Sequence, residues 1–175
     1  MAASSAARHP KNSDEPLIVL ERFLPYRLNV LATVVSNALA QIYSERFSLT
    51  IPAWRVIATL GQYGVRTARD IAAHAVMHKS TVSRAVSGLE ARGLVARQPN
   101  PGDKREELLG LTGEGRRIYA ALAPEALAFE QKLAAGLSPA EQAALFTLVE
   151  RLDIHARALA ETLGAETPLT AETPA

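Results

Sequence analysis

One stretch of the sequence combines short hydroxyl side chains with long cationic ones. It contains, in order, Lys79, Ser80, Thr81, Ser83 and Arg84. Hydroxyl groups of this size reach phosphate oxygens or base edges, and a guanidinium can grip guanine O6 and N7 with two parallel hydrogen bonds. These residue types favour contact with the major groove of duplex DNA. An ordinary solvated start of a helix has the same composition, so the prediction needs support from the surrounding sequence.

A second cationic cluster lies further along the chain. The turn-forming run Asn100–Asp103 separates two apolar runs, Leu94–Gln98 and Glu107–Leu111, and this pattern predicts a β-hairpin. Lys104 and Arg105 would then project from the hairpin loop, where they could enter a minor groove. A plain polar turn is the alternative. A cationic loop that follows a hydroxyl-rich helix strengthens the prediction of DNA binding.

Positive charge is concentrated in this part of the chain. The whole sequence has a formal net charge of only +1, so it is not a polycation that binds any polyanion. Residues 79–105 include six basic and two acidic residues, which gives a local net charge of +4. The basic residues are Lys79, Arg84, Arg92, Arg97, Lys104 and Arg105, and the acidic ones are Glu90 and Asp103.

Apolar residues at three- and four-residue spacing predict the helices that position these clusters. A long first helix, ending near Phe47, carries the stripe Leu24, Leu28, Leu31, Val35, Leu39 and Ile42. A second helix begins at the cap Thr50 and is expected to stop at Gly61 and Gly64. Thr67 and Asp70 have the spacing of a capping box that opens a third helix.

The hydroxyl-rich stretch begins a fourth helix. Its apolar residues, which would face the core, are Val82, Ala85, Val86 and Leu89, and Gly93 would end it. Helical geometry then turns Lys79, Ser80, Ser83 and Arg84 outward.

The remaining sequence predicts two more helices. Thr112 caps the first, which Pro124 is expected to kink. Ser138, Pro139 and Glu141 form a strong start signal for the second. Its apolar residues include Leu145, Leu148, Val149 and Leu152.

This order predicts a mainly α fold with a small β-hairpin wing, a winged helix-turn-helix at residues 48–111. Residues 16–47 and 112–163 would form a flanking helical dimerisation region, because a single chain has too little core to bury all their apolar stripes. Packing of these helices only on each other is the alternative. Residues 1–15 and 164–175 lack periodicity and are expected to be flexible tails.

The combination of motifs resembles the multiple-antibiotic-resistance regulators, the MarR family. The matching runs are Lys79–Arg84, Leu89–Val95, Asp103–Arg105 and Leu111–Gly115, within a match from roughly Leu24 to Leu152. The resemblance implies that the fourth helix is the recognition helix and that Arg105 contacts a minor groove at the wing tip. It also implies that Asp103 orients Arg105 or its neighbours by an ion pair. The DNA contacts expected on this basis are Thr67, Lys79, Ser80, Thr81, Ser83, Arg84, Asp103, Lys104 and Arg105. Gly102 and the acidic pair Glu106 and Glu107 depart from the family pattern and would weaken the wing's grip.

The resemblance also implies an intertwined homodimer, a pseudo-palindromic operator in double-stranded DNA and a small effector. The segment Phe23–Leu28 looks like a subgroup that responds to phenolic acids or their coenzyme A thioesters. Tyr26, Arg27, Trp54 and Arg55 could supply aromatic walls and cations for such a ligand. Trp54 could equally be a core residue, and the arginines could simply be solvated.

Several classes find no support in the sequence. It has no cysteine, its four histidines have no metal-site spacing, and it lacks the common catalytic motifs, so no metal, cofactor or enzymatic activity is expected. No stretch is long and apolar enough for a membrane span, and a cytoplasmic protein is expected. The leading prediction is a repressor released by an aromatic effector. A winged-helix module for protein contacts and an enzyme acting on aromatic acids are the alternatives.

Overall fold

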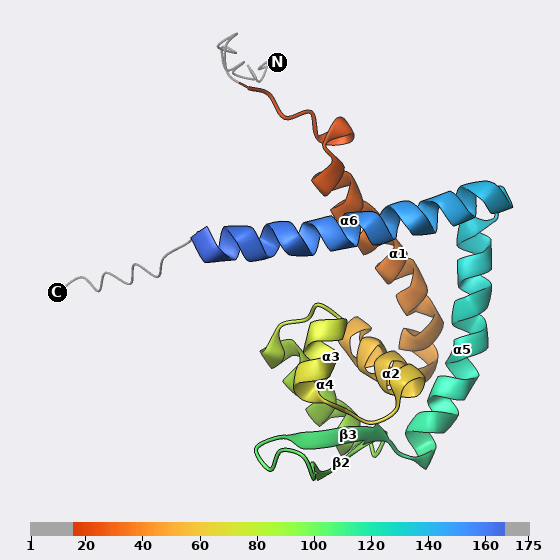
Figure 1. The fold of residues 1–175 in the computed structure, drawn as a ribbon. Helices are drawn as coiled ribbons and strands as arrows, with labels where there is room; N and C mark the ends of the chain where they lie inside the picture. Colours follow the sequence, from red (N-terminus) through yellow and green to blue (C-terminus); the bar gives the residue numbers. More distant parts are fainter. Residues whose placement is uncertain (1–15, 167–175) are drawn as a thin grey trace, which may run out of the picture. The chain divides into compact units, whose positions relative to one another are not determined.

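The computed structural model describes residues 16–166, and its elements follow the predicted order (Figure 1). They are a short 3₁₀ helix (Leu20–Arg22), α1 (Leu24–Phe47), α2 (Ile51–Tyr63), β1 (Arg66–Thr67), α3 (Ala68–His74), α4 (Lys79–Ala91), β2 (Val95–Pro99), β3 (Glu107–Leu111), α5 (Gly113–Ala134) and α6 (Pro139–Glu166). The elements divide into two units between Leu122 and Ala123. Within residues 16–166, no helix is both long and apolar enough to cross a membrane.

The first unit is a winged helix-turn-helix, which confirms the predicted fold class. Its antiparallel sheet has the strand order β1-β3-β2, with Val95 opposite Leu111 and Pro99 opposite Glu107. In Figure 1, α2, α3 and α4 are grouped beside this sheet, and the β2–β3 hairpin extends to one side. Strand β1 was not predicted, because a strand of two residues is too short to show an alternating pattern.

A single cluster of apolar side chains in the first unit holds α2, α3, α4 and the sheet together. Its members that are at most 3% exposed are Tyr43, Leu49, Val56, Ile57, Leu60, Ile71, Val82, Val86, Leu89, Leu94, Val95, Leu109 and Leu122. The stripe of α1 is divided: Leu39 and Ile42 pack against this cluster, whereas Leu24, Leu28 and Leu31 are 42–58% exposed. Only the end of α1 therefore belongs to the core.

Helix α2 begins and ends at two of the three predicted residues. The Thr50 hydroxyl accepts a hydrogen bond from the Ala53 N–H at 3.3 Å, and Gly64, with a φ of 71°, ends the helix. The expected stop at Gly61 is wrong, because α2 continues to Tyr63. A Cβ at position 61 would lie 2.4 Å from Cε2 of Tyr119. Gly61 is therefore required by the packing of the Tyr119 ring, and it does not end the helix.

The second unit contains the end of α5 and all of α6. The capping box predicted at the start of α6 is confirmed, because the Ser138 N–H donates to Glu141 Oε2 at 2.8 Å and the Glu141 N–H donates to Ser138 Oγ at 3.4 Å. Helix α5 continues as one element through Pro124. Helix α6 extends past Leu163 to Glu166, so the first residues of the predicted C-terminal tail are helical. The rest of that tail and residues 1–15 lie outside the described residues.

Two helical glycines make a matched pair for testing the packing. Gly61→Ala should lower the free energy of unfolding by about 1–3 kcal/mol, because the new methyl group collides with the Tyr119 ring. Gly88→Ala in α4 should raise it by about 0.5–1 kcal/mol, because nothing lies within 4 Å of its Cβ position. Urea denaturation measures both, and a stabilising Gly61→Ala would contradict the packing described here.

Candidate nucleic-acid interface

Helix α4 is anchored by its apolar face. Val82, Val86 and Leu89 are each 1% exposed, and Ala85 packs against the same core. On the other side of the helix, Lys79, Ser80, Ser83 and Arg84 are exposed, and Thr81 is half-buried. The predicted outward orientation of these four side chains is confirmed. Whether they contact DNA remains a prediction.

The start of α4 is capped by a residue that the sequence analysis did not single out. His78 precedes the helix, and its Nδ1 accepts a hydrogen bond from the Ser80 N–H at 3.3 Å. The same nitrogen lies 2.8 Å from the Ser80 hydroxyl. Histidine is not among the usual N-cap residues, so its position before the helix carried no clear signal. The Ser80 hydroxyl is thus held in place before any ligand arrives.

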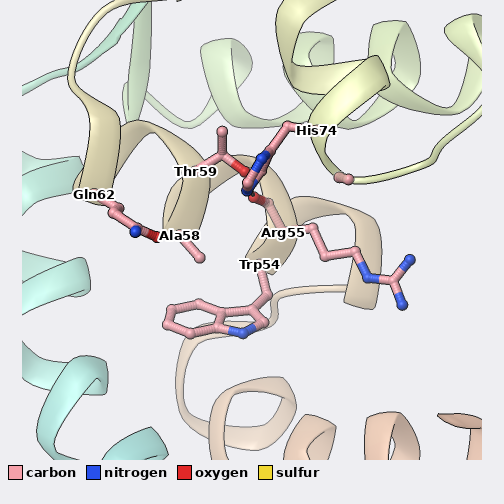
Figure 2. Close-up of a pocket in the computed structure, with 7 residues that line it drawn as sticks. Trp54, Arg55, Ala58, Thr59, Gln62 and His74 are labelled. Atoms are coloured by element: carbon pink, nitrogen blue, oxygen red, sulfur yellow. Dashed lines mark hydrogen bonds between the residues drawn. The ribbon is translucent and has the colours of Figure 1, made fainter. Parts of the chain in front are cut away.

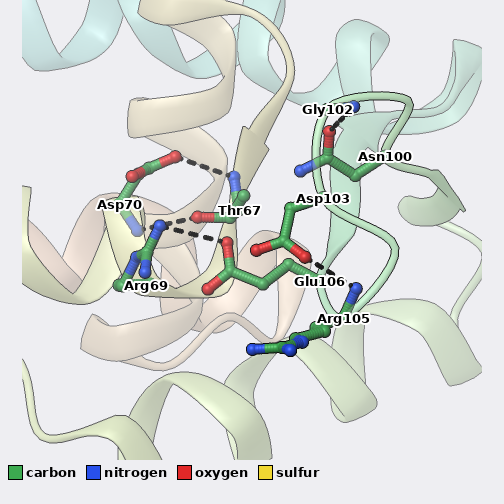
Figure 3. Close-up of polar contacts among 8 residues, drawn as sticks. All are labelled: Thr67, Arg69, Asp70, Asn100, Gly102, Asp103, Arg105 and Glu106. Carbon is green, nitrogen blue, oxygen red and sulfur yellow. Dashed lines mark hydrogen bonds and ion pairs between the residues drawn. The ribbon is translucent and has the colours of Figure 1, made fainter.

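The loop between β2 and β3, residues 100–106, is shaped by its own side chains (Figure 3). Asn100 Oδ1 accepts from the Gly102 N–H at 3.0 Å, and Asp103 Oδ1 accepts from the Arg105 N–H at 2.9 Å. The expected ion pair between Asp103 and Arg105 is therefore replaced by a bond to the Arg105 backbone, which fixes the turn. The side chains of Lys104 and Arg105 remain exposed.

Both acidic residues that depart from the family pattern are paired with arginines. Glu106 lies 3.3 Å from Arg69 at the start of α3, and Glu107 lies 2.9 Å from Arg97 in β2. Arg97 also binds Glu90 of α4 through two bonds of 2.8 and 3.1 Å. The hydrogen bonds from Glu90 and then Glu107 raise the pKa of the Arg97 guanidinium. The carboxylates beside the wing therefore carry less uncompensated negative charge than the sequence alone implies.

Contacts within the protein leave fewer of the basic side chains of residues 79–105 available to bind DNA. Arg97 is held by carboxylates, and Arg92 donates hydrogen bonds to the backbone at the end of α1. Arg92 and Arg97, which were not among the expected DNA contacts, are therefore engaged by other parts of the protein. Of the six, the four whose side chains have neither an ion pair nor a hydrogen bond within residues 16–166 are Lys79, Arg84, Lys104 and Arg105.

Thr67 has a structural role that conflicts with its predicted DNA contact. Its side chain is 6% exposed, and its hydroxyl accepts from the Asp70 N–H at 3.1 Å while Asp70 Oδ2 accepts from the Thr67 N–H at 3.2 Å. This reciprocal pair confirms the predicted capping box of α3. The buried side chain leaves little surface for a nucleic acid, so Thr67 is removed from the expected contacts.

The predicted ligand residues do not form one site within a chain. Trp54 and Arg55 line a cleft of about 240 Å³ together with Ala58, Thr59, Gln62, His74 and Ala75. The Trp54 ring stacks on Tyr43 with centroids 5.4 Å apart, and in Figure 2 the Arg55 side chain extends away from the indole. Tyr26 lies in the first turn of α1, about 25 Å along the helix from Tyr43 at 1.5 Å per residue. Tyr26 and its neighbour Arg27 therefore do not line this cleft in the same chain.

Gln62 and His74 belong to the cleft but were not predicted. His74 comes from α3, and its ring packs edge-on against Tyr63 with centroids 4.8 Å apart. Residues from two helices meet here only in the folded chain, so no sequence spacing could show it. Among residues 16–166, no group of three or more histidine, cysteine or acidic side chains is arranged to hold a metal ion.

Comparison with known proteins identifies the family. A model of the MarR family matches residues 47–106, which span the helix-turn-helix and the wing. The transcriptional regulator HosA of Escherichia coli O111:H- is 33% identical over 105 residues, covering 59% of this chain and 77% of HosA. The chain therefore belongs to the MarR family, whose members are DNA-binding transcriptional regulators.

Solved structures agree with this assignment. NMB1585, a MarR family regulator from Neisseria meningitidis, has a TM-score of 0.68 and 27% identity, covering 86% of this chain and 100% of that one. The PcaV transcriptional regulator from Streptomyces coelicolor, whose structure contains its natural ligand, has a TM-score of 0.65 and 26% identity, covering 81% and 99%.

The capping box of α3 should make part of the stability depend on pH. The hydroxyl and backbone N–H of Thr67 lower the pKa of Asp70, so its stabilising effect is complete above the ordinary pKa of an aspartate and is lost as the pH falls through the lowered value. Asp70→Asn should cost about 0.3–1 kcal/mol at pH 7, because it removes a charge from the first turn of a helix. The difference from wild type should vanish in acid.

Denaturant titrations between pH 2.5 and pH 7 measure this difference. Glu161→Gln is the control, because it removes an exposed carboxylate of α6 that has no hydrogen bond within residues 16–166. A constant loss of stability across this pH range in Asp70→Asn would show that the charge of Asp70 has no part in the cap.

Proposed function

We propose that this chain is a dimeric, sequence-specific transcriptional regulator that inserts the start of α4 into a major groove and the loop 100–106 into the adjacent minor groove. The observation that carries the proposal is the exposed set of Lys79, Arg84, Lys104 and Arg105, which have no ion pair within residues 16–166. Ser83 and Thr81 lie among them on α4 and offer hydroxyls to phosphates or bases. The regulator acts without enzymatic chemistry, on DNA in the cytoplasm.

The exposed apolar side chains of the flanking helices support the homodimer. Leu24, Leu28, Leu31 and Val34 of α1 are 42–59% exposed, and those of α6 are 40–66% exposed. The α6 set is Leu145, Phe146, Leu148, Val149, Leu152, Ile154, Leu159 and Leu163. Surfaces of this kind mark association sites. A two-fold dimer presents two copies of α4, so the operator should be pseudo-palindromic, with half-sites about one helical turn, or 10 bp, apart.

We propose that the effector is a small aromatic acid or its coenzyme A thioester. We further propose that the protein is a repressor and that effector binding releases it from DNA. The solved structure of PcaV with its natural ligand supports a ligand-responsive mode. In this chain, Trp54 offers an aromatic wall, and Gln62 and His74 offer polar groups beside it. Because Tyr26 and Arg27 cannot reach this cleft along α1, they would have to come from the second protomer.

Two substitutions on α4 test the proposed DNA contacts. A duplex is first selected by the wild-type protein from a random pool, and binding is measured to it and to a random duplex of equal length. Arg84→Ala should weaken the selected duplex by about 1–3 kcal/mol and relax its base preference, because a bidentate contact is lost. Lys79→Ala should weaken both duplexes alike and reduce the salt dependence, because only a phosphate contact is lost.

The same experiment checks the dimer. Footprinting on the selected duplex should protect two half-sites, and mass measurement at micromolar concentration should give twice the chain mass. Wild-type binding by both variants would exclude α4 as the recognition helix. A single protected half-site, or a monomeric mass, would exclude the two-fold assembly.

The effector is tested by calorimetry with a panel of aromatic acids and their coenzyme A thioesters, on free protein and on the protein with its selected duplex. Binding should be weaker on the DNA complex by about 5- to 150-fold, because the ligand and DNA favour different states and the coupling is reciprocal. Gln62→Ala should reduce ligand binding, whereas Gln98→Ala on the wing strand should leave it unchanged. Equal ligand affinity with and without DNA would rule out the release mechanism.

A further inference from the structure

One side chain joins the C-terminal ends of α1 and α4. Arg92 follows the last helical residue of α4, and its guanidinium reaches back across the fold. Its Nη1 donates to the Ser48 carbonyl at 3.1 Å, and its Nη2 donates to the Phe47 carbonyl at 2.6 Å. The bonds span more than forty positions of sequence, so they are contacts between elements and not part of a local turn.

The two carbonyls are groups that need a partner. The last carbonyls of a helix have no donor within the helix, and the C-terminal end carries a partial negative charge. Ser48, with a φ of 48°, turns the chain out of α1, and this turn presents both oxygens to the same side. A planar guanidinium can bind two such oxygens at once, which an ammonium group cannot do in the same geometry.

The backbone that follows Arg92 is held in place. Gly93, with a φ of 67°, turns the chain directly after it, and Leu94 is buried in the core. The Thr112 hydroxyl donates to the Gly93 carbonyl at 2.7 Å, which ties this turn to the start of α5. The residue that bonds to the end of α1 is therefore followed at once by a turn that is itself held by the core and by Thr112.

We propose that Arg92 is a positioning residue that holds the recognition helix in a fixed orientation relative to α1, and that it does not contact phosphate. The inference rests on the proposed role of α4 in DNA binding. Base-edge contacts read the sequence and depend on the orientation of α4, whereas the attraction to phosphates that supplies non-specific binding is independent of sequence. Loss of the Arg92 bonds therefore weakens the reading of sequence more than it weakens attraction to DNA.

The test compares Arg92→Ala and Arg92→Lys with a matched control. Arg117→Ala is the control, because it removes one positive charge from an exposed arginine of α5 whose ion pair is with Glu114 of the same helix. Each protein is titrated with the duplex selected by the wild type and with a random duplex, at several salt concentrations. Thermal denaturation gives the temperature range in which every variant is folded.

We expect Arg92→Ala to weaken the selected duplex by about 3- to 10-fold, with the random duplex and both salt slopes unchanged. The affinity of Arg92→Lys for the selected duplex should lie between those of the wild type and Arg92→Ala. Because lysine keeps the positive charge, this variant also serves as the test if Arg92→Ala does not fold. Equal loss on both duplexes, with a salt slope reduced by about 0.9, would show a phosphate contact and overturn the proposal. A lower melting temperature with unchanged binding of both duplexes would also overturn it.

The single tryptophan gives a second readout. Trp54 stacks on Tyr43 near the end of α1, so its emission reports on that junction. If Arg92 holds this junction, the emission without DNA should be the same in the wild type and in Arg117→Ala and different in Arg92→Ala. Equal emission in all three proteins would contradict the connection. If Lys79→Ala and Arg84→Ala both bind like wild type, the assignment of α4 as the recognition helix fails. If those two variants bind more weakly and the Arg92 variants bind like wild type, only the positioning role of Arg92 fails.

Discussion

The burial of three side chains on α4 is the constraint on which the interface depends. Val82, Val86 and Leu89 are spaced so that one face of the helix is closed against the core, each with 1% exposure. Rotation of α4 by one residue would bury Ser83 in place of Val82 and expose apolar surface, which costs several kcal/mol in total. The polar face of α4 therefore has no freedom to turn inward, and the caps and the wing are arranged around a helix whose rotation is already fixed.

The distribution of ion pairs explains how acidic residues can lie beside the surface that we propose binds DNA. Glu90, Glu106 and Glu107 each have an arginine partner on a different element. Exposed pairs of this kind contribute little to the stability of the fold. Their larger effect is electrostatic, because a paired carboxylate repels phosphates less than an isolated one. The chain thus keeps its net positive charge at positions that point outward from α4 and the wing.

Local signals explain what the sequence could predict. The caps at Thr50, Thr67 and Ser138 depend on residues three positions apart, and the buried face of α4 depends on a short periodic pattern. Both are visible without knowledge of the fold. The helix order and the wing followed from these signals, and the fold class was correct. The two-residue strand β1 was missed, because it is defined only by its pairing with β3.

Long-range contacts explain what the sequence could not predict. Arg92 and Arg97 add to the local positive charge in the sequence, but their partners come from α1, α4 and β3, which no sequence pattern shows. Gly61 had the composition of a helix stop, and only the Tyr119 ring shows its true role. Trp54 and Arg55 share a cleft with α3, whereas Tyr26 is separated from it by most of the length of α1. Each of these features depends on a partner that is distant in sequence.

The wing loop obtains its shape from its own side chains, through Asn100 and Asp103, and from the pairs at its base. None of the side chains between positions 100 and 106 is buried in the core. Residues can therefore be inserted or deleted at the tip without opening a cavity in the protein. The reach of the wing can change during evolution independently of the helices, so related regulators can acquire different groove contacts while keeping the same core.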